Sequence, residues 1–270
     1  MQIIERGTGS PRVAVVGGIH GDEPAGPAIV ERLAETLPTG GTAGTVQLII
    51  ANEPAVERQV RYTETDLNRA FPGDSTSDVY ESALAARLVD ILTGADAILA
   101  LHSSQSAPPP FAIFSHRSEA VRRTITGLPV EYAVDSSELR GTTLDSVLAH
   151  AVSLEVGRQG SDDAIEEGYE ATRAFLRTHG VLTDAEPTFT ETKVVRGHEE
   201  VPKGSGEPNV YYSNFVEIPE GEIFARDDTH THRVETEGVV PILASEEGYE
   251  DIYGIYGSFA EPIEPPETDR

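Results

Sequence analysis

The sequence predicts an α/β fold, in which a doubly wound, mainly parallel β-sheet is followed by a smaller all-β domain. Over the first two thirds of the chain, short apolar runs typical of buried parallel strands alternate with segments of helical periodicity. Beyond that point the pattern changes to β-type runs broken by Gly and Pro. We therefore expect an α/β domain over residues 1–186 and a β-rich domain over residues 187–270.

Five apolar runs predict the strands of the first domain, at residues 13–18, 46–52, 97–103, 111–115 and 152–157. Three segments with apolar residues at helical spacing predict helices, at residues 24–37, 77–92 and 161–180. The last of these begins at Ser161, a good N-cap residue, and ends at Gly180. In the second domain, residues 210–218 and 251–259 have the composition of strands.

The charge of the chain is strongly acidic, with 46 Asp and Glu residues against 20 Lys and Arg residues and a net charge of −26. Such a surface repels nucleic acid, which excludes that class of partner. Because salt screens repulsion between like charges, the acidity favours a haloarchaeal protein from a high-salt cytoplasm. Acidity that serves solubility alone is the alternative.

Neither a membrane span nor a secretory signal is expected. No run of about 18 apolar residues occurs, and the first residues lack the charged start and apolar stretch of a signal peptide. These features predict a cytoplasmic protein with no membrane partner, and they leave its oligomeric state, a homo-oligomer included, open. Since the chain has no cysteine, any metal ion must be held by histidines and carboxylates.

Metal-ligating residue types follow three of the predicted strands. His20 and Glu23 follow the first run, His102 ends the third, and Glu155 lies near the end of the last. Because sites in open α/β sheets form at the carboxyl ends of strands, we expect these four side chains to meet. Two imidazoles, one carboxylate and an open position make a catalytic zinc site. A histidine at a strand end can also be a hydrogen-bonded structural residue.

The loop DLNRAFPG, residues 66–73, adds polar groups. Arg69 has the geometry to bind a carboxylate through two parallel hydrogen bonds, and Asn68 can donate beside it. We expect Arg69 to be a buried charge that pairs with the substrate. A capped, solvated turn is the alternative.

Four motifs in this order, GGIHGDEPAG, RYTETDLNRAFPG, LHSS and LEVGRQG, resemble those of the succinylglutamate desuccinylase and aspartoacylase family, relatives of the zinc carboxypeptidases. The resemblance implies one zinc ion per chain, bound by His20, Glu23 and His102. It further implies that Glu155 is the general base and that Arg61 polarises the scissile carbonyl. The motifs lie between residues 17 and 160, and the β-rich remainder is similar to the family's second domain.

The same resemblance implies that Asn68 and Arg69 bind the substrate carboxylate and that Asp66 orients a neighbouring ligand. The family's β-domain also supplies a tyrosine near the substrate. The stretch SEEGYEDIYGIYG offers three, of which we prefer Tyr249 over Tyr253 and Tyr256 because its acidic lead-in is similar.

One position departs from the family pattern. Aspartoacylases place an arginine for the second carboxylate after a Thr-Thr pair, whereas here Leu144 follows Thr142 and Thr143. Arg140 or Arg158 is the candidate replacement.

The function that we predict is a zinc-dependent amidohydrolase whose partner is a small N-acyl amino acid. Two alternatives stay open. One is a carboxypeptidase-like or other small-amide hydrolase of the same fold, and the other is a zinc-binding relative without catalysis. The presence of Glu155 argues against the second.

Overall fold

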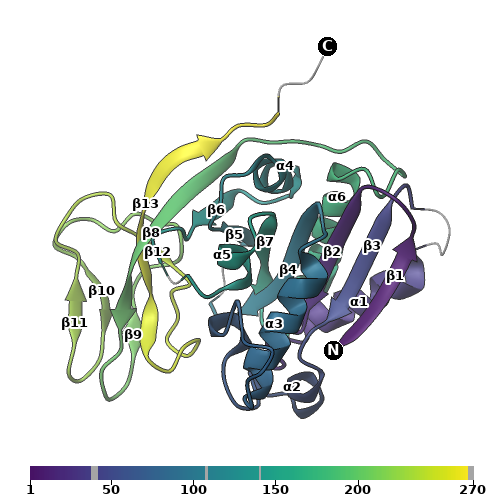
Figure 1. Ribbon diagram of the computed structural model, residues 1–270. Coiled ribbons are helices and arrows are strands. Elements are labelled where there is room, and N and C mark those ends of the chain that lie inside the picture. The colour runs from purple at the N-terminus through teal and green to yellow at the C-terminus, as the bar shows by residue number, and fades with distance from the viewer. Residues whose placement is uncertain (38–41, 107–108, 140, 267–270) are drawn as a thin grey trace.

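The computed structural model of the protein describes residues 1–37, 42–106, 109–139 and 141–266. Its main feature is a ten-stranded sheet with helices on both faces, accompanied by a separate three-stranded antiparallel sheet (Figure 1). This architecture confirms the predicted fold class.

The large sheet has two parallel blocks that meet at the antiparallel pair β7 and β5, and it is antiparallel at both edges. Parallel pairing joins β3, β2, β4 and β7, and again β5, β6 and β8; the other neighbours are antiparallel. In spatial order the strands are β1 (Gln2–Gly7), β3 (Thr45–Ile50), β2 (Arg12–Gly17), β4 (Ala97–Ser104), β7 (Ala151–Arg158), β5 (Phe111–Phe114), β6 (Tyr132–Asp135), β8 (Thr192–Pro202), β13 (Ile252–Ile263) and β12 (Val240–Ile242). The small sheet contains β11 (Thr231–Arg233), β10 (Ile223–Arg226) and β9 (Asn209–Val210).

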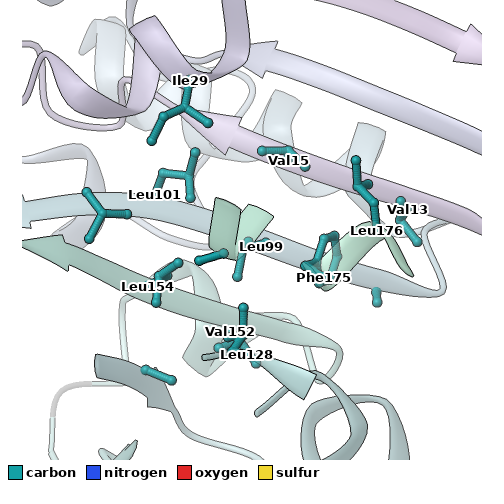
Figure 2. Close-up of a cluster of buried hydrophobic side chains, with 14 of the residues drawn as sticks. Val13, Val15, Ile29, Leu99, Leu101, Leu128, Val152, Leu154, Phe175 and Leu176 are labelled. Carbon is teal, nitrogen blue, oxygen red and sulfur yellow. The ribbon is translucent and has the colours of Figure 1, made fainter. Parts of the chain in front are cut away.

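Helices cover both faces of the sheet because successive residues of the central strands point to opposite faces, and the residues on each face are apolar. The helical elements are α1 (Ala25–Thr36), α2 (Glu53–Arg58), the 3₁₀ helix η1 (Leu67–Arg69), α3 (Tyr80–Leu92), α4 (Glu119–Gly127), α5 (Leu144–Val147) and α6 (Asp162–Thr178). On one face Val13 and Val15 of β2 belong to a core that includes α1, α4 and α6 (Figure 2). On the other face Ala14 and Val16 belong to a second core, with α3 and α5. This alternation makes the sheet doubly wound.

The predicted elements of the first 180 residues are confirmed to within about three residues, as expected for element boundaries. The five apolar runs form β2, β3, β4, β5 and β7, and the three helical segments form α1, α3 and α6. The sequence pattern did not reveal that β5 runs antiparallel to β7, nor that β1 adds an antiparallel edge. None of the described helices is long and apolar enough to cross a lipid bilayer.

The chain after residue 187 belongs to both sheets. Its strands β8, β13 and β12 extend the large sheet, whereas β9, β10 and β11 form the small one. A strand was predicted over residues 210–218, but within this range only Val210 belongs to a strand. The extended backbone is interrupted at Phe215, which adopts a left-handed φ of 62° and stacks its ring on that of Tyr132, with ring centroids 4.4 Å apart. The division into domains at residue 186 stays a prediction.

Candidate active site

The loop between β2 and α1 brings His20 and Glu23 into the interior. Gly21 allows this, because a Cβ atom there would lie 2.0 Å from the backbone carbon of Ala55 in α2. Both side chains are buried, and His20 Nδ1 lies 2.6 Å from Glu23 Oε1. The glycines of this motif therefore let the backbone pack closely enough to turn polar side chains inward.

His102 and Glu155 reach the same place from adjacent strands. They are direct partners in the parallel register of β4 and β7, and both are buried. His102 Nδ1 lies 3.3 Å from Glu23 Oε2, and the Ser103 N–H donates a 3.0 Å hydrogen bond to the same oxygen. The four side chains predicted to meet do so at one edge of the sheet.

Three of these residues suit a metal ion. One ligand atom each from His20, Glu23 and His102 lies within 4.8 Å of the others, and all three residues are buried. Two imidazoles and one carboxylate are a common protein donor set for catalytic zinc. The rest of the described chain contains no other such group of three.

Asp66 connects the histidine cluster to two arginines. Its Oδ1 lies 3.1 Å from His20 Nε2, and its Oδ2 accepts a 3.1 Å hydrogen bond from Arg61 Nε and lies 3.7 Å from Arg69 Nε. Although burial opposes ionisation, the contacts with His20 and Arg61 hold the pKa of Asp66 well below its usual range. This carboxylate has the position of a group that orients a histidine ligand.

The electrostatics of the cluster favour positive charge at His20. Burial alone would lower its pKa, but Glu23 and Asp66 more than offset this effect and raise the pKa of His20 to about 9. Burial also opposes ionisation of Glu23, yet His20 and His102 hold the pKa of Glu23 well below its usual value. Such a cage of carboxylates and imidazoles stabilises a cation.

Glu155 has a different environment. Burial raises its pKa to about 7, with His102 opposing this change and the charge of Glu23 adding to it. Its Oε2 is buried, and no hydrogen-bond partner for that oxygen exists among the described residues. A carboxylate of this kind can accept a proton near neutral pH and return it.

The four clustered side chains line a pocket, and four residues of the loop from Arg61 to Arg69 line it as well, namely Arg61, Asp66, Asn68 and Arg69. Arg61 Nη1 lies 3.5 Å from Glu23 Oε1, and Asn68 Oδ1 accepts a 3.2 Å hydrogen bond from Leu144 N, which leaves its amide group as a donor. The Arg69 side chain is 41% exposed. The expectation that it is a buried charge is therefore wrong, because η1 holds it at the mouth of the pocket.

Sequence reasoning missed Glu81, which holds this loop in place from α3. The fully buried carboxylate accepts hydrogen bonds from Thr63 N, Thr63 Oγ1, Glu64 N, Thr65 N and Asn52 Nδ2, at 2.7 to 3.3 Å. A glutamate in the first turn of an amphipathic helix gives no sign of this role in the sequence, since acids are common there for helix-dipole reasons.

Tyr249 lies on the pocket wall, in the loop between β12 and β13. Burial and the charge of Glu155 raise its pKa far above the usual value, so its hydroxyl stays protonated. The other two candidates do not line the pocket. Tyr253 donates to Asp227 Oδ2 at 2.8 Å, and Tyr256 packs on Phe224.

The second-carboxylate position is not filled by Arg158, which is exposed and absent from the pocket lining. Arg140, the other candidate, lies outside the described residues. The residue after Leu144 does line the pocket, and it is an acid, Asp145.

Comparisons with known proteins identify the family and the relatives that this chain resembles. Residues 9–178 match the family model described as succinylglutamate desuccinylase/aspartoacylase catalytic domain. An N-acyl-aromatic-L-amino acid amidohydrolase (carboxylate-forming) from Xenopus tropicalis is 29% identical over 186 residues, which cover 61% of this chain and 60% of that protein. An N-alpha-acetyl-L-2,4-diaminobutyric acid deacetylase from Halomonas elongata is 31% identical over 154 residues, 53% of this chain and 44% of the relative.

Among solved structures, the product-bound ectoine utilization protein EutE (DoeB) from Ruegeria pomeroyi superposes with a TM-score of 0.79 at 21% identity, covering 96% of this chain and 88% of that one. At this identity the likeness concerns the fold. The chain spans roughly half of the length of the curated relatives it matches.

Proposed function

Because this chain belongs to the succinylglutamate desuccinylase/aspartoacylase family, we propose that it is a zinc-dependent amidohydrolase that cleaves the amide bond of an N-acyl amino acid. The observation that carries this proposal is the buried cluster of His20, Glu23 and His102 with Glu155 beside it. The names of the matched relatives, an amidohydrolase and a deacetylase of N-acyl amino acids, support the substrate class.

When bound by His20, Glu23 and His102, zinc would supply Lewis-acid activation of water and of the amide carbonyl. Glu155 then takes the proton of the attacking water through its free Oε2 and donates it to the leaving amine. A pKa raised by burial suits both steps, since the group must be a base first and an acid afterwards.

Arg61 and Tyr249 are the donors available to the carbonyl oxygen as negative charge develops on it. Arg61 is fixed by its hydrogen bond to Asp66, and Tyr249 lines the same pocket as a neutral hydroxyl. Donors that are already in place stabilise such charge without reorganisation. At the mouth of the pocket, Arg69 and the Asn68 amide bind the α-carboxylate of the amino acid.

Composition adds a setting to this function. Because the net charge is −26, we propose that the enzyme works in the cytoplasm of a high-salt cell.

The test is an activity screen of the zinc-loaded protein in concentrated KCl, with N-acetyl amino acids, N-succinyl amino acids, their α-carboxamides and dipeptides as substrates. We expect free amine from the N-acyl acids and a loss of at least about tenfold in kcat/KM for the carboxamides, because Arg69 loses its partner. Turnover by Glu155→Gln should be lower by at least about 100-fold. Hydrolysis of dipeptides alone would indicate a carboxypeptidase-like enzyme. Tight zinc binding with no hydrolysis of any compound would indicate a relative without catalysis.

A further inference from the structure

Asp145 is a buried carboxylate of the active-site pocket that the reaction proposed above does not use. It lies in the short helix α5, is 2% exposed and lines the pocket. Three serine hydroxyls donate to it, Ser115 at 2.8 Å and Ser136 at 3.3 Å to Oδ2, and Ser153 at 3.2 Å to Oδ1. Ser136 and Ser153 line the pocket as well.

Asp145 is linked through its neighbours to Glu155, where the substrate amide reacts, and to Asn68 and Arg69, where the substrate carboxylate binds. Ser153, its partner, precedes Glu155 by two residues on β7, so the two side chains lie on one face of the strand, about 7 Å apart. On the other side, the backbone N–H of Leu144 is bonded to Asn68, next to Arg69. An amino acid with its amide at Glu155 and its α-carboxylate at Arg69 therefore has its side chain in the part of the pocket that contains Asp145.

Among the described residues, no positively charged group balances the charge of Asp145. No Arg, Lys or His of the described residues forms an ion pair with it, and the described arginines of the pocket, Arg61 and Arg69, both lie beside Asp66 instead. The serine hydroxyls are neutral donors, and they leave capacity on a carboxylate that can accept about four hydrogen bonds. A buried carboxylate in this state favours a cationic partner and repels an anionic one.

Part of the wall of this pocket is apolar, and it includes Ile113, the strand-pairing partner of Ser153. Ile242, Leu243, Ile252 and Ile255 contribute to it from β12, β13 and the loop between them. Methylene groups pack well on such a wall, so the site fits a short alkyl chain that ends in an ammonium group.

We propose that Asp145 determines specificity by binding a positively charged amino group on the substrate side chain, so that the preferred substrates are Nα-acyl diamino acids. This inference rests on the proposed deacylase function and narrows it. This role also explains the departure from the aspartoacylase pattern at residues 142–145. Leu144 replaces the arginine that binds a second carboxylate in those enzymes, and the next residue, Asp145, lines the pocket as an acid.

The first experiment compares three substrates of similar length with the zinc-loaded wild-type protein: Nα-acetyl-2,4-diaminobutyrate, its neutral isostere N-acetylnorvaline, and N-acetylglutamate. We expect kcat/KM to fall by about tenfold from the cationic to the neutral compound, and by about 100-fold to the anionic one. Equal or faster hydrolysis of N-acetylglutamate would overturn the proposal.

The second experiment uses Asp145→Asn, which keeps the shape of the side chain and removes its charge. The ratio of kcat/KM for the cationic compound to that for the neutral one should fall at least tenfold. The matched control Asp163→Asn, an exposed acid on α6, should keep the wild-type ratio. An Asp145→Asn enzyme with an unchanged ratio would show that Asp145 only anchors α5.

Failure of the proposed function has a separate signature. If none of the three amides is hydrolysed and the wider screen of N-acetyl and N-succinyl amino acids releases no free amine either, the deacylase function is refuted, and Asp145 is tested by the products alone. Free 2,4-diaminobutyrate should then raise the thermal midpoint of the wild type more than norvaline does, and it should lose this advantage with Asp145→Asn. Equal shifts would overturn the binding role as well.

Discussion

Asp66 Oδ1 lies 3.1 Å from the Nε2 atom of His20, on the side of the imidazole ring opposite to the nitrogen that faces Glu23. A carboxylate behind a histidine ligand fixes the ring orientation and increases its basicity. The same carboxylate binds Arg61, so one residue couples the proposed metal site to the proposed oxyanion donor.

We therefore expect Asp66→Asn to weaken zinc binding by about 10- to 100-fold. Competition with a chromophoric chelator measures this affinity. Asp78→Asn, an exposed acid in the following loop, is the matched control and should bind zinc as the wild type does. Unchanged affinity in Asp66→Asn would mean that His20 needs no orienting partner.

Glu155→Gln should retain one zinc ion per chain and lose turnover by at least about 100-fold, because the amide cannot accept a proton. Elemental analysis of the reconstituted protein and amine release measure the two properties. The control is Glu166→Gln, whose carboxylate pairs with Arg32 on the surface. An active Glu155→Gln protein would show that another group is the base. The zinc site would be refuted if the reconstituted wild-type protein contained less than about 0.2 zinc ions per chain and no more zinc than His20→Ala.

Glu81→Gln tests whether the loop from Arg61 to Arg69 depends on its anchor. A glutamine amide cannot accept all of the hydrogen bonds that this carboxylate accepts, and each buried N–H left without a partner costs about 1 to 3 kcal/mol. We expect a lower thermal midpoint and a fall in kcat/KM, since Arg61 and Asn68 lose their positions. Rescue of activity by concentrated zinc would argue against this mechanism. The control is Glu57→Gln, at an exposed acid on α2, which should change neither the thermal midpoint nor kcat/KM.

The contrast between Glu81 and the cluster of His20, Glu23 and His102 explains what the sequence could and could not reveal. His20, Glu23 and His102 were recognisable because their types and their positions after apolar runs carry chemistry, and the rule for strand ends then brings them together. Glu81 has an ordinary residue type in an ordinary helix, and its role exists only through backbone and side-chain donors that lie 16 or more residues earlier in the chain. Similarly, Asp145 became visible only when its serine partners were assembled from β7 and from the ends of β5 and β6.

The fold shows the same division. Apolar runs and helical spacing locate the central elements, because burial on both faces leaves a continuous apolar pattern. The pairing of β8 with β6, which makes the C-terminal strands part of the large sheet, depends on partners that no local pattern specifies.

His179 should make stability depend on pH between about 4 and 6.5. Burial, with the charge of Arg123 adding, lowers the pKa of His179 from 6.5 to about 4 in the folded protein, where its ring bonds Thr124 Oγ1 at 2.7 Å. Between these values the unfolded state binds more protons, so this group's contribution is complete above pH 6.5 and is lost as the pH falls towards 4. The loss amounts to about 3 kcal/mol at most.

The measurement is the free energy of unfolding at pH 7.5 and pH 4.5 for the wild type and for His179→Gln. The difference between the two proteins should shrink on acidification, because only the wild type loses stability through this residue. His150→Gln, an exposed histidine, serves as the control and should show no such change. A difference that is constant or larger at pH 4.5 would contradict the assigned pKa.

Salt dependence follows from the charge of the surface. Glu191 raises the pKa of Glu264 through the repulsion between their charges, an example of how like charges crowd one another on this protein. With a net charge of −26, the thermal midpoint should fall as KCl is lowered from about 2 M to about 0.1 M, because the Debye length grows from a few ångströms to about 10 Å. Glu264→Gln should raise the midpoint at 0.1 M KCl and have no effect at 2 M, since it removes a repulsion that concentrated salt already screens. Glu166→Gln, which removes a carboxylate paired with Arg32, should not raise the midpoint at either concentration. A wild-type midpoint that stays flat or rises on dilution would exclude adaptation to high salt, and the acidity would then serve solubility alone.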